Sequence, residues 1–224
     1  MAYDAKNRLT SKTYSDSTPA ANFYYDESSV TVGGTPYTLT NTKGRLTHTS
    51  TASGNAFTIH SYDKMARTED LWQCTPYNCS SASIWHAHYS HDVGGNLASW
   101  QHPNGETITQ TFSNAPRITQ ITSSLNDSTH PGALAQNIHY SPQGSVSSLQ
   151  NGCVGTGCTQ KQETYDYNNR LQSVRIQLGT SSSPNANACT VYNYYSGVAN
   201  PTSCSIPSQA SNGNDGSEMG GSGA

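Results

Sequence analysis

The sequence is poor in charged residues, poor in hydrophobic residues and free of long apolar runs. Charged side chains make up 11% of its 224 residues and hydrophobic side chains 33%, both low for an ordinary globular domain. A formal net charge of -3 without a basic cluster leaves no electrostatic footprint for nucleic acid. No apolar stretch approaches the ~20 residues of a membrane-spanning helix, so we expect neither nucleic-acid binding nor membrane insertion.

The residues that are abundant are typical of strands and turns. Ser, Thr, Gly and 14 tyrosines dominate, whereas Leu, Glu and Lys, which favour helices, are few. The low net charge and the tyrosine rings argue against a disordered chain. Residues 1–207 are therefore predicted to form one β-sheet region, and the Gly-, Ser- and Asn-rich segment 208–224 a flexible tail. Because no signal peptide begins the chain, we expect it to be a piece of a longer polypeptide with any export signal upstream.

One short motif recurs along the chain. Its clearest copies are Tyr3-Asp4-Ala5-Lys6-Asn7-Arg8-Leu9 and Tyr165-Asp166-Tyr167-Asn168-Asn169-Arg170-Leu171. Partial copies are Tyr62-Asp63-Lys64-Met65-Ala66-Arg67-Thr68 and Thr40-Asn41-Thr42-Lys43-Gly44-Arg45-Leu46. Repetition at a fixed period is the first property to test, because it defines repeat architectures.

Weaker copies complete the array. They start at Phe112 and Tyr140, and the segment from Tyr89 to Leu97 is interpreted as a copy with two extra residues in its turn. Tyr24-Tyr25-Asp26 is interpreted as a further, decayed unit. The starting positions 62, 89, 112, 140 and 165 are 27, 23, 28 and 25 residues apart, which leaves room for one hairpin and a connection.

Each motif position has a physical reason. The Tyr closes one strand with a large ring, and the Asp next to it can bond the backbone two residues on and begin a turn. The fifth residue is a type that tolerates the left-handed backbone of a tight hairpin turn. That position is taken by Asn7, Gly44, Gly144 or Asn169. The Arg and Leu then begin the next strand, and the alternating segments 57–62, 106–112 and 171–178 support strands on either side.

The repeated Tyr-Asp-x-x-Asn-Arg-Leu pattern resembles the RHS/YD-repeat family, from Tyr3 to about Tyr195. The resemblance implies an all-β fold of tandem β-hairpin repeats in a curved or spiralling antiparallel sheet. In that family the sheet closes into a shell around a toxin or other cargo, and related shells act in cell-surface adhesion. Ser90, Ser113 and Ser141 replace the Asp, and neither a terminal self-cleavage segment nor a toxin domain is visible. The chain is thus expected to be an open internal segment of such a shell.

The six cysteines fall into three local pairs. Cys74 and Cys79, like Cys153 and Cys158, enclose four turn-forming residues between motif copies, and Cys189 and Cys204 close a longer loop. An even count with local spacing favours three disulfides and therefore a secreted or cell-surface protein. Free thiols or a zinc site are the alternatives; zinc would need four ligands from pairs about 80 residues apart.

The candidates for catalysis and metal binding are weak. The segment His86-Ala87-His88-Tyr89-Ser90-His91-Asp92 places two imidazoles on one strand face, where they could bind a metal, but surface residues are the favoured interpretation. Asp4, Asp63 and Asp166 occupy equivalent turn positions rather than facing each other as a catalytic pair. No Gly-x-Ser-x-Gly motif occurs, so we expect no enzyme, no catalytic residue, no cofactor and no metal.

Two functional hypotheses remain. The first is a non-catalytic structural wall of a cargo-enclosing or adhesive shell, whose partners are neighbouring repeats and an enclosed C-terminal toxin. The second is a carbohydrate-binding surface module, because exposed aromatic rings suit contacts with surface glycans. The rings available for it are Tyr24, Tyr25, Tyr192, Tyr194, Tyr195, Trp72, Trp85 and Trp100.

Overall fold

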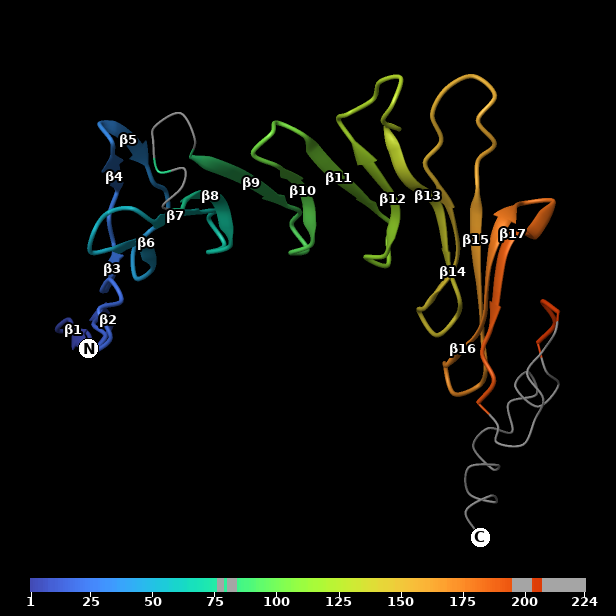
Figure 1. Ribbon diagram of the computed structural model, residues 1–224, viewed down its shortest axis with the longest axis horizontal. Helices are drawn as coiled ribbons and strands as arrows, with labels where there is room; N and C mark the ends of the chain where they lie inside the picture. Colours follow the sequence, from blue (N-terminus) through green and yellow to red (C-terminus); the bar gives the residue numbers. More distant parts are fainter. Residues whose placement is uncertain (76–78, 80–83, 195–202, 207–224) are drawn as a thin grey trace, which may run out of the picture. The chain divides into compact units, whose positions relative to one another are not determined.

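The computed structural model of the protein describes residues 1–75, 79, 84–194 and 203–206. The chain divides into two compact units, Met1–Thr107 and Ile108–Ala224. Every regular element of the described residues is a β-strand (Figure 1). In that part of the chain there is no helix with the length and apolar character needed to cross a membrane. The predicted tail at 208–224 and Tyr195 lie outside the described residues.

The first unit contains one antiparallel sheet and a separate two-stranded hairpin. The sheet order is β1-β2-β3-β6-β7-β8-β9-β10, and β4 pairs with β5. The strands are β1 (Ala2–Tyr3), β2 (Leu9–Lys12), β3 (Ala21–Tyr25), β4 (Ser29–Val32), β5 (Thr35–Thr38), β6 (Leu46–Thr51), β7 (Phe57–Tyr62), β8 (Thr68–Cys74), β9 (Trp85–His91) and β10 (Leu97–Gln101).

The second unit is a succession of antiparallel neighbours in chain order, from β11 to β17. Its strands are β11 (Thr107–Phe112), β12 (Ile118–Ser123), β13 (Ala133–Tyr140), β14 (Val146–Asn151), β15 (Gln162–Tyr167), β16 (Ser173–Thr180) and β17 (Ser183–Val191). The all-β fold class and the antiparallel succession of hairpins predicted from the sequence are confirmed.

The motif forms a tight turn held by its Asp. Asp4 Oδ1 accepts two backbone N–H groups, including that of Arg8 at 2.9 Å, and Asp4 Oδ2 accepts Arg8 Nε at 2.7 Å. Asn7, the fifth residue, has a φ of 61°, the left-handed conformation expected there. The copy at Asp63 repeats the three bonds, with Ala66 left-handed at a φ of 73°. An alanine in this conformation is strained, so the turn bonds must compensate for its Cβ.

The extra residue of each turn also shifts the strand register by one position. In the first copy Tyr3 lies opposite Leu9 and Ala2 opposite Ser11, which is the irregularity of a β-bulge. The first and seventh motif positions consequently face each other at the base of the turn. The same pairing occurs at Tyr25 and Leu46, Tyr62 and Thr68, Phe112 and Ile118, Tyr140 and Val146, and Tyr167 and Ser173.

The copies proposed at Tyr24–Asp26 and at Thr40–Leu46 are one unit, not two. Tyr25 lies opposite Leu46, and the N–H of Asp26 donates to the Arg45 carbonyl at 3.1 Å. Gly44 N–H donates to the Asp26 carboxylate, whereas the equivalent N–H of Asn7 donates to the backbone carbonyl of Asp4. The sequence interpretation was wrong here because segment 27–43, which contains β4 and β5, is inserted into the middle of the turn.

The last clear copy lies two residues further along than predicted. Asn168 Oδ1 accepts the N–H groups of Arg170 and Gln172, both at 3.0 Å, so Asn168 takes the Asp position. The left-handed residue is Leu171, with a φ of 65°, and Asn169 is not among the residues with positive φ. The predicted role of Asn169 was therefore wrong, because Asn168 provides the same turn-forming acceptor.

The predicted motif residues Tyr165 and Asp166 lie inside β15 rather than at a turn. Asp166 Oδ2 accepts Arg175 Nε from β16 at 2.8 Å. The Tyr165 hydroxyl donates to the Glu163 carboxylate, and burial together with that bond raises the Tyr165 pKa to about 12. Tyr167 holds the place that the sequence assigned to Tyr165.

The copy at Tyr89–Leu97 has a turn of ordinary length. Asp92 Oδ1 accepts the Asn96 N–H at 2.9 Å, and Gly95 has a φ of 90°. The motif begins at His91, whereas Tyr89 lies within β9. The sequence suggested two extra residues because a histidine, and not a tyrosine, occupies the first motif position, and the preceding tyrosine is Tyr89.

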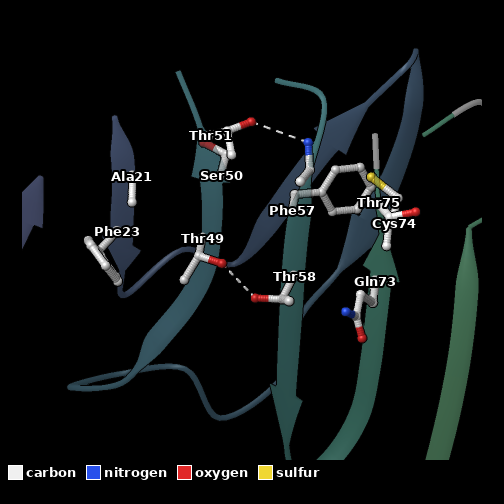
Figure 2. Close-up of a pocket in the computed structure, with 11 residues that line it drawn as sticks. Ala21, Phe23, Thr49, Ser50, Thr51, Phe57, Thr58, Gln73, Cys74 and Thr75 are labelled. Carbon is white, nitrogen blue, oxygen red and sulfur yellow. Dashed lines mark hydrogen bonds between the residues drawn. The ribbon is translucent and has the colours of Figure 1, made fainter. Parts of the chain in front are cut away.

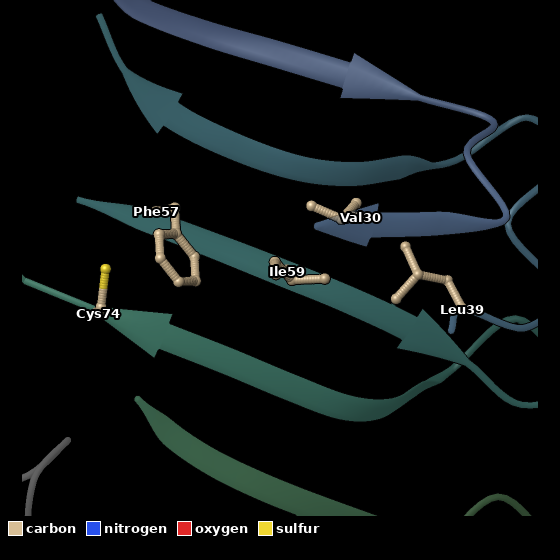
Figure 3. Packing of buried hydrophobic residues seen from close by; sticks show 5 residues of the cluster. All are labelled: Val30, Leu39, Phe57, Ile59 and Cys74. Atoms are coloured by element: carbon tan, nitrogen blue, oxygen red, sulfur yellow. The ribbon is translucent and has the colours of Figure 1, made fainter. Parts of the chain in front are cut away.

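The principal apolar core lies where the inserted hairpin packs on the first sheet. Phe57 and Ile59 of β7 pack with Val30 of β4, Leu39 after β5 and Cys74 of β8 (Figure 3). Ile59 is fully buried, and β7 alternates between buried and half-buried residues, as the sequence predicted for 57–62. The second unit differs: its buried hydrophobic residues Ile108, Ile138 and Val174 lie one to a strand, and all residues of β14 and β15 are half-buried.

Candidate functional site: the contacts between repeats

The repeat tyrosines bind the backbone of the preceding repeat. The hydroxyl of Tyr62 donates to the Leu46 carbonyl at 2.7 Å, and that of Tyr140 donates to the Ile118 carbonyl at 2.8 Å. In each case the acceptor is the seventh motif residue of the repeat before. We call this bond the tyrosine link. It also joins Tyr25 to Leu9, Tyr167 to Val146 and Tyr194 to Ser173, at 3.0, 2.8 and 2.8 Å.

The arginine of one repeat covers the tyrosine of the next. Arg8 lies over the Tyr25 ring at 4.3 Å from its centroid, and Arg45 over Tyr62 at 5.5 Å. Arg117 and Tyr140 repeat this contact in the second unit at 5.4 Å. A guanidinium at this distance is attracted by the electron-rich face of the ring.

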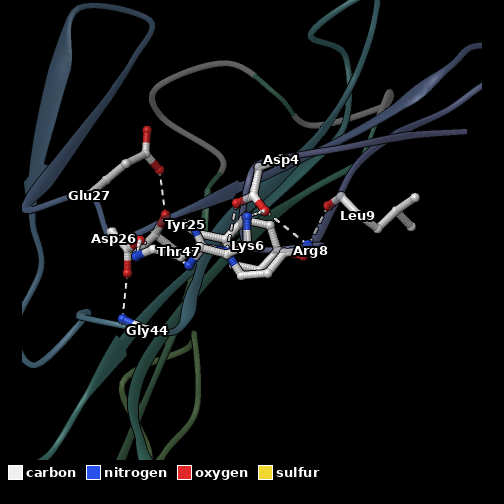
Figure 4. Close-up of polar contacts among 9 residues, drawn as sticks. All are labelled: Asp4, Lys6, Arg8, Leu9, Tyr25, Asp26, Glu27, Gly44 and Thr47. Atoms are coloured by element: carbon white, nitrogen blue, oxygen red, sulfur yellow. Dashed lines mark hydrogen bonds and ion pairs between the residues drawn. The ribbon is translucent and has the colours of Figure 1, made fainter.

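The first junction adds ionic contacts (Figure 4). Arg8 extends from its own turn to the Asp26 carboxylate, with Nη1 2.9 Å from Oδ2, while Lys6 Nζ lies 3.6 Å from the same oxygen. The backbone N–H of Gly44 and the Arg8 side chain lower the pKa of Asp26. One arginine therefore fixes its own turn through Asp4 and the following turn through Asp26.

Two repeats begin with residues other than tyrosine. His91 stands at the first position after the Tyr62 repeat and has no hydroxyl; there Arg67 Nη1 donates to the Asp92 carbonyl at 3.0 Å instead. Phe112 likewise has no hydroxyl. The sequence pattern identified Tyr62 as a repeat tyrosine but not Tyr25, Tyr167 and Tyr194. Tyr25-Asp26 and Tyr167-Asn168 do have a tyrosine followed by a turn-forming Asp or Asn, which is how a motif copy begins.

The histidine cluster does not form a metal centre. His86 Nε2 and His88 Nδ1 both bond to Asp70 Oδ1, at 2.9 and 2.8 Å, and Trp72 stacks on His86 at 4.8 Å. His91 belongs to the next turn. In the described ranges, no group of three or more His, Cys, Asp or Glu residues is placed to hold a metal ion.

The structure joins the cysteines in the three predicted pairs. Cys74–Cys79, Cys153–Cys158 and Cys189–Cys204 form disulfides, with Cα atoms 4.9, 5.8 and 5.8 Å apart. The first two lie between the motif turns, at the other ends of their strands. Each closes a short connection, where a cross-link restricts the unfolded chain.

A shallow pocket lies over the first sheet (Figure 2). Its volume is about 300 Å³, and Thr49 of β6 and Thr58 of β7 share a hydroxyl hydrogen bond of 2.7 Å beside it. Cys74, the one thiol-derived group in the lining, is oxidised in its disulfide. Among the described residues the lining has no carboxylate or imidazole, and these are the usual groups for general acid–base chemistry. The remaining lining residues are Ala21, Phe23, Ser50, Thr51, Ala56, Phe57, Gln73 and Thr75.

The aromatic residues considered for ligand binding have different environments. Trp72 is half-buried against Tyr37 at 5.4 Å between ring centroids, and Tyr24 stacks on His48 at 3.9 Å. Tyr192 and Tyr194 stack at 6.5 Å. Trp85 is half exposed, which leaves its ring open to a ligand.

No protein-family model and no curated protein matches this chain. Among solved structures, one described as TcdB2-TccC3-TEV is 13% identical with a TM-score of 0.46, over 85% of this chain and 12% of that one. TcdB2-TccC3 without its hypervariable C-terminal region is 14% identical with a TM-score of 0.45, over 85% and 11%. A Tc holotoxin pore of Photorhabdus luminescens is 14% identical with a TM-score of 0.25, over 80% and 14%. The chain thus spans about an eighth of the length of these three toxin-complex chains.

Proposed function

We propose that this chain is a non-catalytic structural segment of a larger RHS/YD-type protein, in which it builds part of the wall of a cargo-enclosing or adhesive shell. Its partners in this role are the adjoining repeats of the same polypeptide and an enclosed C-terminal toxin or other cargo. The described residues offer the wall role more support than catalysis, because their polar contacts are used within turns and between repeats.

The tyrosine link is the observation that carries this proposal. It joins the first residue of one repeat to the seventh of the repeat before, as Tyr62 joins Leu46 and Tyr140 joins Ile118. A bond of fixed register between neighbours can be repeated indefinitely, so a sheet of any length can be assembled from short units. Structural walls need this property, whereas an active site needs groups from different elements to converge at one point.

The three disulfides support a secreted or cell-surface location. Such bonds persist in oxidising compartments and are rare where thiols are kept reduced. All six cysteines are paired. Alkylation of the natural protein without reduction should therefore label none of the six cysteines of this chain, and alkylation after reduction should label all six.

Electron microscopy of the longest natural polypeptide that contains this chain tests the wall role. We expect a hollow particle whose wall includes the strands of residues 2–191 at the hairpin spacing seen here. A compact particle without an interior, or a chain in which these strands form a detached module, would rule the wall out.

A further inference from the structure

The arginine at the sixth position of a repeat reaches the fifth residue of the next turn. A Cβ at Gly144 would lie 3.6 Å from Arg117 Nη2, and a Cβ at Gly95 would lie 3.9 Å from Arg67 Nη1. Arg67 Nη1 also donates to the Asp92 carbonyl of that same turn at 3.0 Å. The fifth residue is therefore part of the surface on which the preceding repeat docks.

Backbone conformation alone does not explain glycine at this position. Gly95 and Gly144 are left-handed, with φ of 90° and 97°. Ala66 and Leu171 are also left-handed at the fifth position of their turns, with φ of 73° and 65°, so this chain forms the turn with residues that have a Cβ. A Cβ at 3.6 Å from a guanidinium makes an ordinary van der Waals contact, whereas a side chain that continues beyond Cβ would compete with the guanidinium for space. Glycine or alanine thus leaves room for the arginine.

The size of the fifth residue follows the sixth residue of the preceding repeat. Each arginine at the sixth position is followed by a turn of the same unit whose fifth residue is small: Arg8 by Gly44, Arg45 by Ala66, Arg67 by Gly95 and Arg117 by Gly144. Figure 4 shows one such junction, where Arg8 bonds to the Asp26 carboxylate that also accepts the Gly44 N–H. The turn after Ser145, which has no guanidinium to accommodate, has Leu171 at this position.

We propose that the fifth residue of a turn selects the preceding repeat by size. Glycine or alanine accepts a repeat that has arginine at its sixth position, and a larger residue accepts a repeat without it. The arginine favours the matched neighbour because it lies over the tyrosine of the same turn, as Arg117 lies over Tyr140 at 5.4 Å from the ring centroid. A longer fifth side chain excludes the guanidinium from this place and so acts against the wrong neighbour. The selection operates at junctions inside this chain, whether or not the sheet encloses a cargo.

A double-mutant cycle at the junction of Arg117 and Gly144 tests this selection. Gly144→Leu is introduced into the full 224-residue chain with and without Arg117→Ser, and urea denaturation followed by hydrogen exchange in β13–β15 reports the stability of the second unit. We expect Gly144→Leu to lower the folding equilibrium constant about fivefold more when Arg117 is present. The backbone penalty is the same in both backgrounds and cancels. Gly155→Leu is the matched control, because Gly155 is left-handed at a φ of 85° but lies in open space, and its cost should not depend on Arg117.

The converse cycle introduces an arginine at the junction that lacks one. Ser145→Arg should raise the folding equilibrium constant of the second unit about twofold to fivefold in the Leu171→Gly background, and should give no gain while Leu171 is in place. Because Leu171→Gly relieves backbone strain, this cycle decides the question even if Gly144→Leu fails to fold. The proposal is overturned if a cycle is additive, or if Gly155→Leu depends on Arg117 as strongly as Gly144→Leu does. Additive cycles would leave the wall role intact, whereas a particle without a hollow interior would leave the measured coupling unchanged.

Discussion

The two compact units use the same turns and tyrosine links on two different kinds of sheet. In the first unit a hairpin inserted at 27–43 covers one face of the sheet and buries Phe57 and Ile59. In the second unit the repeats run without such an insertion, and whole strands such as β14 and β15 remain half-buried. Yet Tyr167 bonds the Val146 carbonyl as Tyr62 bonds that of Leu46. The repeat scheme therefore does not depend on a local apolar core.

The difference indicates where each unit gains its stability. Full burial of a Val, Leu, Ile or Phe side chain contributes about 1.5–3 kcal/mol, and the first unit collects several such side chains in one cluster. The second unit relies on its strand ladders and on polar cross-strand contacts, such as Asn151 to Glu163 at 2.8 Å. A single hydrogen bond contributes about 0.5–1.5 kcal/mol net, so the second unit needs many such bonds to reach a comparable stability.

Removal of the covering hairpin should have the largest effect. When residues 27–43 are replaced by two turn residues, Tyr25-Asp26 and Gly44-Arg45 can still close the turn, but Phe57 and Ile59 lose their cover. We expect a loss of roughly 3–6 kcal/mol from the first unit, at about 1.5–3 kcal/mol for each exposed side chain. Hydrogen exchange should become fast in β6–β8 and stay unchanged in β14–β16. Unchanged protection in β6–β8 would show that the hairpin is not a cover.

A matched pair of isoleucine truncations measures the same contrast at single positions. Ile59→Ala removes a fully buried side chain and should cost about 2–5 kcal/mol, the range for buried isoleucines. Ile176→Ala removes a half-buried side chain of β16 and should cost less than half as much, because little cavity is left. Urea denaturation followed by hydrogen exchange assigns each loss to its unit. Equal costs would mean that the second sheet is covered as well as the first.

Removal of a tyrosine hydroxyl should cost the same in both units. Tyr62→Phe and Tyr167→Phe each break one tyrosine link at constant ring packing, for an expected loss of about 0.5–1.5 kcal/mol. Tyr24→Phe is the control, because among the described residues the Tyr24 hydroxyl has no hydrogen-bond partner. His91→Tyr should restore a link to the Thr68 carbonyl and raise the melting temperature of the first unit. A loss in one unit only would show that the links are not equivalent.

The sequence was sufficient to predict the class of fold but not the register of every repeat. The alternation of 57–62 and the Asp-to-Arg spacing of the first copy are local properties, and the structure has both. The join between Tyr25-Asp26 and Gly44-Arg45 depends on a contact across the insertion 27–43, which no local pattern reveals. The sequence pointed to Tyr165 instead of Tyr167, because residues 165–171 share more identical residues with the first copy. The turn, however, is formed by the residues that follow Tyr167.

The tyrosine links were less predictable than the turns. They depend on which strands are neighbours and on which face a side chain occupies, and a shift of one residue reverses the face. The backbone conformation at the fifth motif position was also not predictable from the residue type alone. Leu171 and Ala66 adopt a conformation that their residue types disfavour, because the bonds around the turn determine it.

Glycine substitutions test the corrected register of the last turn. Leu171→Gly should stabilise the second unit by roughly 0.5–1 kcal/mol, because glycine adopts the left-handed conformation without a Cβ penalty. Asn169→Gly should give no gain, since its backbone lies outside that region. Thermal unfolding compares the two variants. If Asn169→Gly stabilised the unit and Leu171→Gly did not, the turn would have the register that the sequence predicted.

Low pH should weaken the Asp-containing turns of the first unit and leave the equivalent turns of the second unit intact. The Arg8 N–H lowers the pKa of Asp4, and the Asn96 side-chain and backbone donors lower that of Asp92. A carboxyl with a depressed folded-state pKa stabilises the fold above its unfolded pKa, and that stability is lost as pH falls through the folded pKa. At the equivalent positions the second unit has Ser113, Ser141 and Asn168, which do not titrate.

Between about pH 4 and pH 2, the amides of Arg8 and Asn96 should therefore lose protection from exchange, while that of Gln172 keeps it. The loop at Asp127 provides an internal negative control in the second unit. Its carboxylate accepts the N–H of Thr129 at 2.7 Å and that of His130 at 2.9 Å. These bonds lower the pKa of Asp127 so far below its usual range that the His130 amide should also keep its protection down to about pH 2. Loss of protection at Gln172 together with Arg8 would mean that acid unfolds the whole chain. Loss at Arg8 and Asn96 alone would show that ionised aspartates hold these turns of the first unit, and that the neutral Asn168 amide holds the equivalent turn of the second.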